Sequence, residues 1–275
     1  MVRIESPQNP RIKATVKLRD ARERRRAGTF LVEGYRELER GYRSGYQLSE
    51  LFYCPSLLTS EGRLFIDETT RHDNSPALLE VSEVVFEKLV MREGSDGLVG
   101  VLQQRRHGPE NLRITGSNPL LLVLEEVEKP GNVGALFRTA DAAGVDAVIL
   151  TGKGADPYNP NAIRASLGTI LTVPFFIMEP EQAYRLGVTM GCQWIAASPY
   201  GAESYFTIDC TGPLAVVLGS EAHGLSSYWD RPEVHKVVIP MCGVADSLNV
   251  SVAGAVILYE SLRQRTAKSS KETSR

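Results

Sequence analysis

Three segments of the chain place small polar or charged residues directly after apolar runs of strand length. Residues 130–134 (PGNVG) come shortly after the run 120–124, and Arg138 stands further along the same segment. Residues 219–225 (GSEAHGL) follow the run 214–218 and present Glu221 between glycines. Residues 240–251 follow a third run, the β-branched residues 237–239, and carry Ser247 and Asn249. Ligands of open α/β sheets bind where strands end, so these loops predict a ligand site.

The side chains in these loops suggest what each one does. The glycines allow backbone to approach a ligand closely, and Asn132 is expected to cap the helix that follows. Arg138 is a charge on a helix otherwise lined with Ala, Val, Leu and Phe, so we expect it to face an anion or a partner subunit, or else solvent. Glu221 presents a carboxylate at a cleft, unless its loop is only a structural turn. Backbone groups near Ile239 and Leu248 are suited to a flat heterocycle.

The elements around these loops alternate between strands and helices. The segment after residue 130 has helical spacing and ends at Gly144, and the last helix is expected to begin near Leu248. Such alternation predicts an α/β fold with a parallel sheet covered on both faces. The expected strands of this part are residues 120–124, 147–150, 194–197, 214–218 and 237–239.

The chain is expected to divide into two domains. Strands at residues 30–32, 51–53 and 98–102, with helices between them, predict a smaller N-terminal α/β domain over residues 1–105. The turn-rich stretch 106–118 is expected to be a linker. Residues 119–265 form the larger predicted domain, and the polar residues 266–275 are expected to be disordered.

Composition excludes several classes of protein. The chain has 275 residues, 43% of them hydrophobic and 23% charged, which is typical of a globular protein. No apolar run reaches about 18 residues, so we expect no membrane span, and the N-terminus lacks the apolar core of a secretory signal. The four cysteines are scattered and the four histidines form no ligand pair, so we expect reduced thiols, a cytoplasmic location and no metal. Dinucleotide, P-loop and nucleophile-elbow motifs are missing.

Positive charge is concentrated at the start of the chain. Residues 1–26 carry a net charge of +6, which leaves −8 on residues 27–275. A basic arm on an acidic protein suggests contacts with phosphate groups, although a solvated helix face is the simpler alternative. The expected RNA-binding residues are Arg11, Lys13, Lys17, Arg24 and Arg25.

Taken in order, the three loops resemble the signature motifs of the SpoU/TrmH branch of the SPOUT RNA 2′-O-ribose methyltransferases. The matching segments are residues 132–140 (NVGALFRTA), 218–225 (LGSEAHGL) and 239–253 (IPMCGVADSLNVSVA). Upstream, residues 28–34 (GTFLVEG) look like the start of the family's substrate-binding domain, which is related to kink-turn-binding ribosomal proteins. Lys129 departs from the aspartate of many relatives, which affects substrate details more than activity.

This resemblance implies a deep trefoil knot that holds S-adenosyl-L-methionine, and a homodimer with its active site at the subunit interface. The cofactor-binding residues it implies are Gly219, Ile239, Met241 and Leu248. The catalytic set it implies is Asn132, Arg138, Glu221, Ser247 and Asn249. A guanidinium is a poor base at neutral pH, so Arg138 is expected to stabilise the developing ribose oxyanion.

The expected activity is therefore methylation of a ribose 2′-hydroxyl in RNA. The sizeable N-terminal domain favours large-subunit rRNA over tRNA as the substrate. A tRNA 2′-O-methyltransferase and a catalytically inactive RNA-binding relative are the alternatives.

Overall fold

The computed structural model describes residues 2–71, 75–91, 96–111, 114 and 116–273, and its chain forms two units. The first unit contains Met1–Arg105 together with Asp156–Thr172, and the second contains Arg106–Ala155 with Val173–Arg275. Residues 112, 113 and 115 of the predicted linker, and residues 274 and 275 of the predicted tail, lie outside the described residues.

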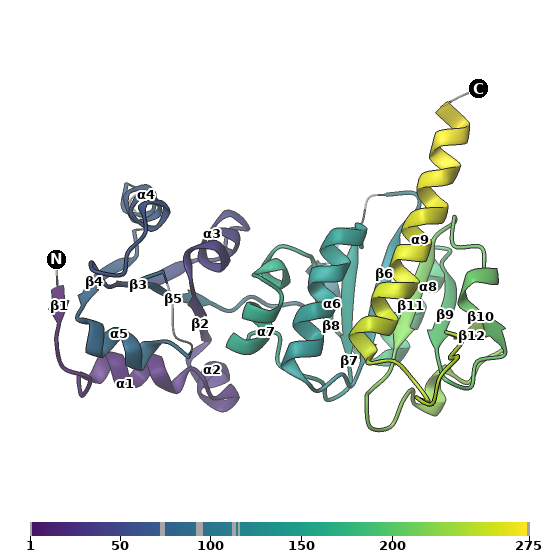
Figure 1. The fold of residues 1–275 in the computed structure, drawn as a ribbon, viewed down its shortest axis with the longest axis horizontal. Helices are drawn as coiled ribbons and strands as arrows, with labels where there is room; N and C mark the ends of the chain where they lie inside the picture. Colours follow the sequence, from purple (N-terminus) through teal and green to yellow (C-terminus); the bar gives the residue numbers. More distant parts are fainter. Residues whose placement is uncertain (1, 72–74, 92–95, 112–113, 115, 274–275) are drawn as a thin grey trace. The chain divides into compact units, whose positions relative to one another are not determined.

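The first unit is built on a mixed sheet with the strand order β1-β4-β3-β5-β2. Helices α3 and α4 lie on one side of this sheet, and α1, α2 and α5 lie on the other (Figure 1). Strands β2, β3 and β5 were expected from their apolar runs, whereas β1 and β4 were not. The strands are β1 (Val2–Ile4), β2 (Thr29–Glu33), β3 (Leu48–Tyr53), β4 (Ala77–Val81) and β5 (Leu98–Gln103). The helices are α1 (Pro10–Lys17), α2 (Ala21–Ala27), α3 (Tyr35–Arg43), α4 (Ser60–Thr69) and α5 (Glu83–Leu89).

The segment Asp156–Thr172 joins the first unit although the chain around it belongs to the second. It contains α7 (Pro160–Ala165) and the short 3-10 helix η2 (Thr169–Leu171). Tyr158 packs against the ring of Phe30 with centroids 4.4 Å apart, and its hydroxyl accepts a hydrogen bond from the backbone N–H of Arg105 at 2.9 Å. Burial and the neighbouring Tyr46 raise the pKa of Tyr158, so its hydroxyl stays protonated. We call residues 156–172 the inserted segment.

The second unit contains a sheet in which every pairing is parallel, as expected, with the order β10-β12-β9-β11-β6-β7-β8. Val123 and Val217 pack with Ala183 of α8 on one face. Leu218, one position along, faces the other side, where α6 and α9 lie side by side (Figure 1). The strands are β6 (Leu120–Glu125), β7 (Ala147–Thr151), β8 (Phe175–Ile177), β9 (Gln193–Ala197), β10 (Glu203–Ser204), β11 (Leu214–Leu218) and β12 (Val234–Val238). The helices are α6 (Pro130–Ala143), α8 (Pro180–Thr189) and α9 (Val250–Thr273), with the 3-10 helices η1 (Pro109–Asn111), η3 (Tyr205–Thr207) and η4 (Ser227–Trp229).

The close packing of α9 depends on a glycine. A Cβ atom at Gly254 would collide with the side chains of Leu136 on α6 and Leu218 on β11. Helix α9 therefore lies directly over the sheet end from which the 219–225 loop departs.

Four local expectations are corrected. Strand β12 begins at Val234 because it pairs with β9 from there, and it ends before Ile239. Helix α6 begins at Pro130, so Asn132 lies in its first turn and does not cap it. Helix α9 begins only at Val250. It continues to Thr273 through residues that were expected to be disordered from 266 onward, because this stretch contains neither proline nor glycine.

Candidate functional site

The loop after β11 is a tight hairpin that exposes a carboxylate. Ser220 and Gly224 exchange two backbone hydrogen bonds of 3.0 and 2.9 Å, and Gly224 has a positive φ of 68°. A Cβ atom at Gly219 would collide with the backbone of Gly224, so only glycine allows the hairpin to close this tightly. Glu221 is exposed at the tip of this hairpin.

A chain of hydrogen bonds joins the three predicted loops. The Asn132 side-chain amide donates to Oε1 of Glu221, and the Asn249 side-chain amide donates to Oδ1 of Asn132 at 3.2 Å. Oδ1 of Asn249 also accepts from the backbone N–H of Ser251 at 2.9 Å, as an N-cap residue does, which explains why α9 begins after Asn249. The loops after β6, β11 and β12 thus meet, although up to 117 positions separate their residues.

A hollow of about 780 Å³ opens at this meeting point. All four predicted cofactor residues, Gly219, Ile239, Met241 and Leu248, line it. Apolar residues such as Leu225 and Val237 line the hollow together with polar ones such as Ser220 and Asp246, and this mixture fits a nucleoside cofactor such as S-adenosylmethionine. The volume also lies within the usual range of about 300–1,000 Å³ for small-molecule sites.

The predicted catalytic residues divide into two groups. Glu221, Ser247 and Asn249 line the hollow. Asn132 does not line it but holds Glu221 and Asn249, which do. Arg138 is exposed on α6 and does not line the hollow, and among the described residues its side chain has no hydrogen-bond partner. The structure thus brings four of the five residues together, and the catalytic role of all five stays a prediction.

Several lining residues were not expected from the sequence. Lys129, Ser198, Tyr200 and Lys236 all face the hollow, and Tyr200 is 93% exposed. Outside the hollow, the buried carboxylate of Glu125 accepts hydrogen bonds from the Ser226 backbone N–H at 2.8 Å and hydroxyl at 2.7 Å. Glu125 therefore anchors the far end of the 219–225 loop. In the sequence, the only indication of this role is that an acidic residue directly follows the apolar run 120–124.

The five predicted RNA-binding residues differ in their exposure. Arg11, Lys13, Lys17 and Arg25 are exposed. Arg24 is only 1% exposed. Its guanidinium pairs with Asp156 of the inserted segment at 2.6 Å and donates to the backbone oxygens of Leu18 and Arg19. Arg24 is therefore a structural residue, because its donors are already satisfied inside the first unit.

Two negative findings concern the part of the chain that the structure describes. No helix within it has both the length and the apolar character needed to cross a membrane. None of its His, Cys, Asp and Glu side chains gather in threes or more in a way suited to a metal ion.

The sheet, its hollow and the three converging loops define an α/β protein with a small-molecule site at the carboxyl ends of parallel strands. The chain belongs to the SpoU rRNA Methylase family, whose family model matches residues 119–259. Residues 9–100 match the MRM3-like substrate binding domain.

Individual relatives match nearly the whole chain. A tRNA/rRNA methyltransferase of Synechocystis sp. is 32% identical, over 97% of this chain and 95% of its own. The 23S rRNA (guanosine(2553)-2′-O)-methyltransferase of Bacillus subtilis is 29% identical, over 94% of this chain and 98% of its own. The AdoMet-bound rRNA methyltransferase of Sinorhizobium meliloti is 28% identical and superposes with a TM-score of 0.84, over 95% of this chain and 97% of its own. These likenesses confirm the SPOUT-type fold expected from the three motifs.

Proposed function

We propose that this protein transfers a methyl group from S-adenosylmethionine to a ribose 2′-hydroxyl of large-subunit ribosomal RNA. The observation that carries the proposal is the hollow that the loops after β11 and β12 line together. Hydrogen bonds connect Glu221 and Asn249, which line it, through Asn132. The relatives support the substrate, since those from Bacillus subtilis and Streptomyces viridochromogenes are named 23S rRNA 2′-O-methyltransferases.

The residues that line the hollow bind the cofactor and exclude water from it. When bound, S-adenosylmethionine provides a methyl group on a sulfonium, which is a good leaving group. Gly219, Ile239, Met241 and Leu248 line the hollow and would hold the cofactor there. The absence of a side chain at Gly219 would let the cofactor approach the backbone, and the apolar side chains would exclude water.

The polar side chains then act on the ribose. Ser247 and Asn249 line the hollow and orient the ribose, while Asn132 keeps Glu221 and Asn249 in register. Arg138 stabilises the negative charge that develops on the 2′-oxygen and grips the adjacent phosphate. A guanidinium is a poor proton acceptor at neutral pH, so Arg138 acts as a cation and not as the base, and the proton of the 2′-hydroxyl passes to water.

We also propose that the protein is a homodimer in which Arg138 acts in the partner's site. Arg138 is exposed and does not line the hollow of its own chain. Helix α9, which packs against α6, exposes Val252 (47%) and Tyr259 (51%) seven positions apart, and this spacing places both on one helix face. Two exposed apolar side chains on a helix that packs against the helix of Arg138 fit a self-complementary interface.

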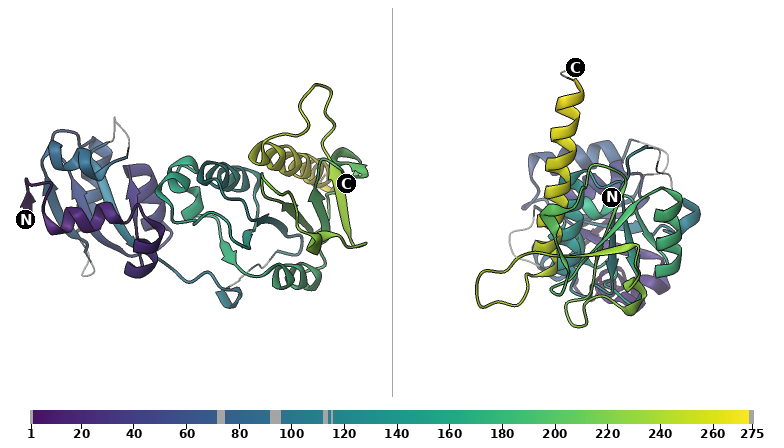
Figure 2. Two further views of the ribbon diagram at one scale, coloured as in Figure 1. Left: turned by 90° about the horizontal axis from the view of Figure 1, so that it is seen from below. Right: turned by 90° about the vertical axis from the view of Figure 1, so that its right-hand side faces the viewer.

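The remaining expectations complete the proposal. Residues 1–105 bind the RNA, with Arg11, Lys13, Lys17 and Arg25 as exposed phosphate contacts, and the methyltransferase domain begins near residue 119. The protein works in the cytoplasm. The segment 239–249, which forms the loop between β12 and α9 (Figure 2), belongs to the trefoil knot.

The test is direct methylation of rRNA. Purified protein is incubated with radiolabelled S-adenosylmethionine and either unmodified 23S rRNA or unmodified tRNA, and 2′-O-methyl positions are mapped by alkaline hydrolysis. We expect one protected ribose in 23S rRNA. Methylation of tRNA alone would reassign the substrate, and cofactor binding without transfer to either RNA would indicate an inactive relative.

A further inference from the structure

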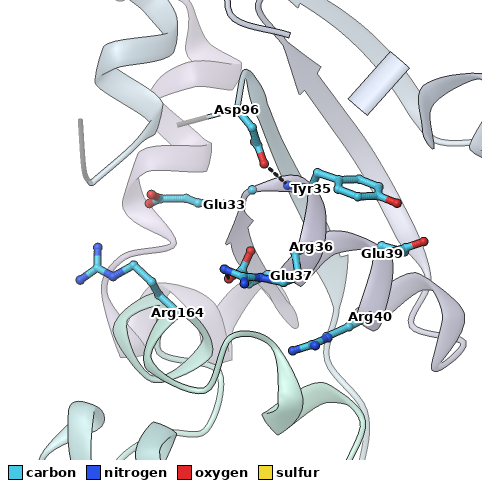
Figure 3. A pocket seen from close by; sticks show the side chains of 9 residues that line it. Glu33, Tyr35, Arg36, Glu37, Glu39, Arg40, Asp96 and Arg164 are labelled. Atoms are coloured by element: carbon cyan, nitrogen blue, oxygen red, sulfur yellow. Dashed lines mark hydrogen bonds and ion pairs between the residues drawn. The ribbon is translucent and has the colours of Figure 1, made fainter. Parts of the chain in front are cut away.

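A second hollow, of about 570 Å³, lies in the first unit between the start of α3 and the inserted segment (Figure 3). Arg36 and Arg40 of α3 and Arg164 of α7 line it together with acidic side chains. Three arginines from two separate stretches of sequence thus face one space in a unit that matches a substrate-binding domain.

Two of these arginines are held in position from the inserted segment. The Arg40 guanidinium donates to the backbone oxygen of Leu167, and the Arg164 guanidinium donates to Oδ1 of Asn161 at 2.7 Å. Each bond occupies one of the five N–H donors of a guanidinium. The side chains are therefore fixed while most of their donors remain for a ligand, which lowers the entropy cost of binding one.

A covered carboxylate faces the same hollow. The Glu37 side chain is 9% exposed and lies 3.6 Å from the Arg36 guanidinium. Two other carboxylates that line the hollow accept hydrogen bonds from backbone N–H groups. The N–H of Tyr35 donates to Asp96 at 2.6 Å (Figure 3), and the N–H of Met91 donates to Glu33 at 3.0 Å.

Among the described residues, none donates a hydrogen bond to Glu37. Arg36 forms an ion pair with Glu37, and the carboxylate oxygens that line the hollow can still accept hydrogen bonds from a ligand that brings donors. Gly34 leaves room for this carboxylate, because a Cβ atom there would lie 2.9 Å from Oε2 of Glu37.

The ligand must therefore carry both an anionic group and hydrogen-bond donors. A nucleotide of single-stranded RNA has both, since its phosphate suits guanidinium forks and its ribose hydroxyls and base amines suit a carboxylate. The volume also lies within the range of about 300–1,000 Å³ that small ligands occupy. We propose that this hollow binds one unstacked nucleotide of the RNA substrate, with its phosphate on Arg36 and Arg164 and a base or ribose donor on Glu37. This inference rests on the proposed function.

The assignment gives the inserted segment a role. Arg164 lies within residues 119–259, which match the methyltransferase family, yet it belongs to the substrate-binding unit. The methyltransferase part of the sequence thus supplies one wall of an RNA site outside its own unit.

The experiment measures equilibrium binding of full-length protein to unmodified 23S rRNA by filter retention across a range of salt concentrations. We expect Arg164→Ala and Glu37→Gln each to weaken binding about tenfold, and Arg164→Ala to lower the salt slope by about one. Arg164→Lys should restore the slope but only part of the affinity. The control is Arg43→Ala on α3, the helix of Glu37, since Arg43 is exposed, pairs with Glu39 and does not itself line the hollow. Thermal unfolding establishes that each variant is folded.

The outcomes separate this site from the overall activity. Unchanged RNA binding in folded Arg164→Ala and Glu37→Gln proteins overturns the site, even if the wild-type protein methylates rRNA. A wild-type protein that binds RNA but transfers no methyl group contradicts the proposed function. The RNA affinities of the wild type and the two variants still test the nucleotide site in that case. Titration with the four free nucleoside monophosphates forms a second arm. Binding of a free nucleotide that these variants abolish, with RNA binding unchanged, overturns the assignment to RNA.

Discussion

Asn249, at the start of α9, donates its side-chain amide to Oδ1 of Asn132 in the first turn of α6, at 3.2 Å. The same Asn249 caps its own helix, and the same Asn132 donates to Glu221. One pair of amides therefore sets the relative positions of two helices and a hairpin around the cofactor hollow.

Replacing Asn132 should slow methyl transfer without weakening cofactor binding. Asn132→Ala leaves Glu221 and Asn249 without their shared partner, although Asn132 itself does not line the hollow. We expect kcat to fall about tenfold or more from lost positioning, while the Kd for S-adenosylmethionine changes less than about twofold. Ser251→Ala, which removes a hydroxyl donor to Asn249 but keeps the cap, is the control. A normal kcat for Asn132→Ala would contradict the positioning role.

The proposed place of Arg138 in the partner's site predicts complementation between two inactive variants. Arg138→Ala should bind S-adenosylmethionine normally but transfer no methyl group, and Leu248→Arg should not bind the cofactor because it fills the hollow. In a mixed dimer, the intact hollow of one chain meets the intact Arg138 of the other. Random mixing should restore about one quarter of wild-type activity.

The measurement is methyl transfer after the two variants are unfolded and refolded together, with light scattering to establish dimers. Each variant refolded alone is the control. If Arg138 served its own chain, every site in the mixture would carry a defect and no activity would return.

Neighbouring arginines of the basic arm should behave differently. Arg24→Ala leaves Asp156 without its buried partner, so we expect a loss of about 3 kcal/mol in the free energy of unfolding. Arg25 is exposed, so Arg25→Ala should leave stability within about 0.5 kcal/mol of wild type while weakening RNA binding. Urea denaturation and filter retention measure the two effects. Equal stability of the two variants would show that the pairing of Arg24 with Asp156 does not stabilise the first unit.

Thiol labelling should distinguish one cysteine from the other three. Cys242 is exposed, whereas Cys54, Cys192 and Cys210 are buried. Burial also raises the pKa of Cys192 and Cys210 to about 11, so both remain protonated and unreactive at pH 8. Iodoacetamide should modify one thiol of the native protein and all four in urea, as counted by mass spectrometry. Rapid labelling of Cys210 in the native protein would indicate that the 208–212 segment opens.

Much of the second unit was predictable because its signals are local. Parallel strands buried on both faces give continuous apolar runs, and the loops that follow them carry polar residues and glycines. The boundaries were less predictable, since α9 begins only where the Asn249 side chain becomes a cap, and β12 begins where its partner β9 is available. Strand β1, with three residues, pairs with β4 and has no sequence signal of its own.

By itself, the sequence determined the α/β class and the three loops, because residue types and short spacings specify these features. The family resemblance implied the cofactor residues Gly219, Ile239, Met241 and Leu248, whose role stays a prediction although all four line one hollow. Tertiary structure alone decided which charged side chains are buried in ion pairs and which stay exposed. Arg24 and Arg25 are adjacent in one basic run, yet only Arg24 meets a carboxylate, 132 positions away, and is buried. Likewise, the inserted segment joins the first unit, where Arg164 lines one hollow with Arg36 and Glu37. Such pairings depend on long-range packing, which a local pattern of charge does not encode.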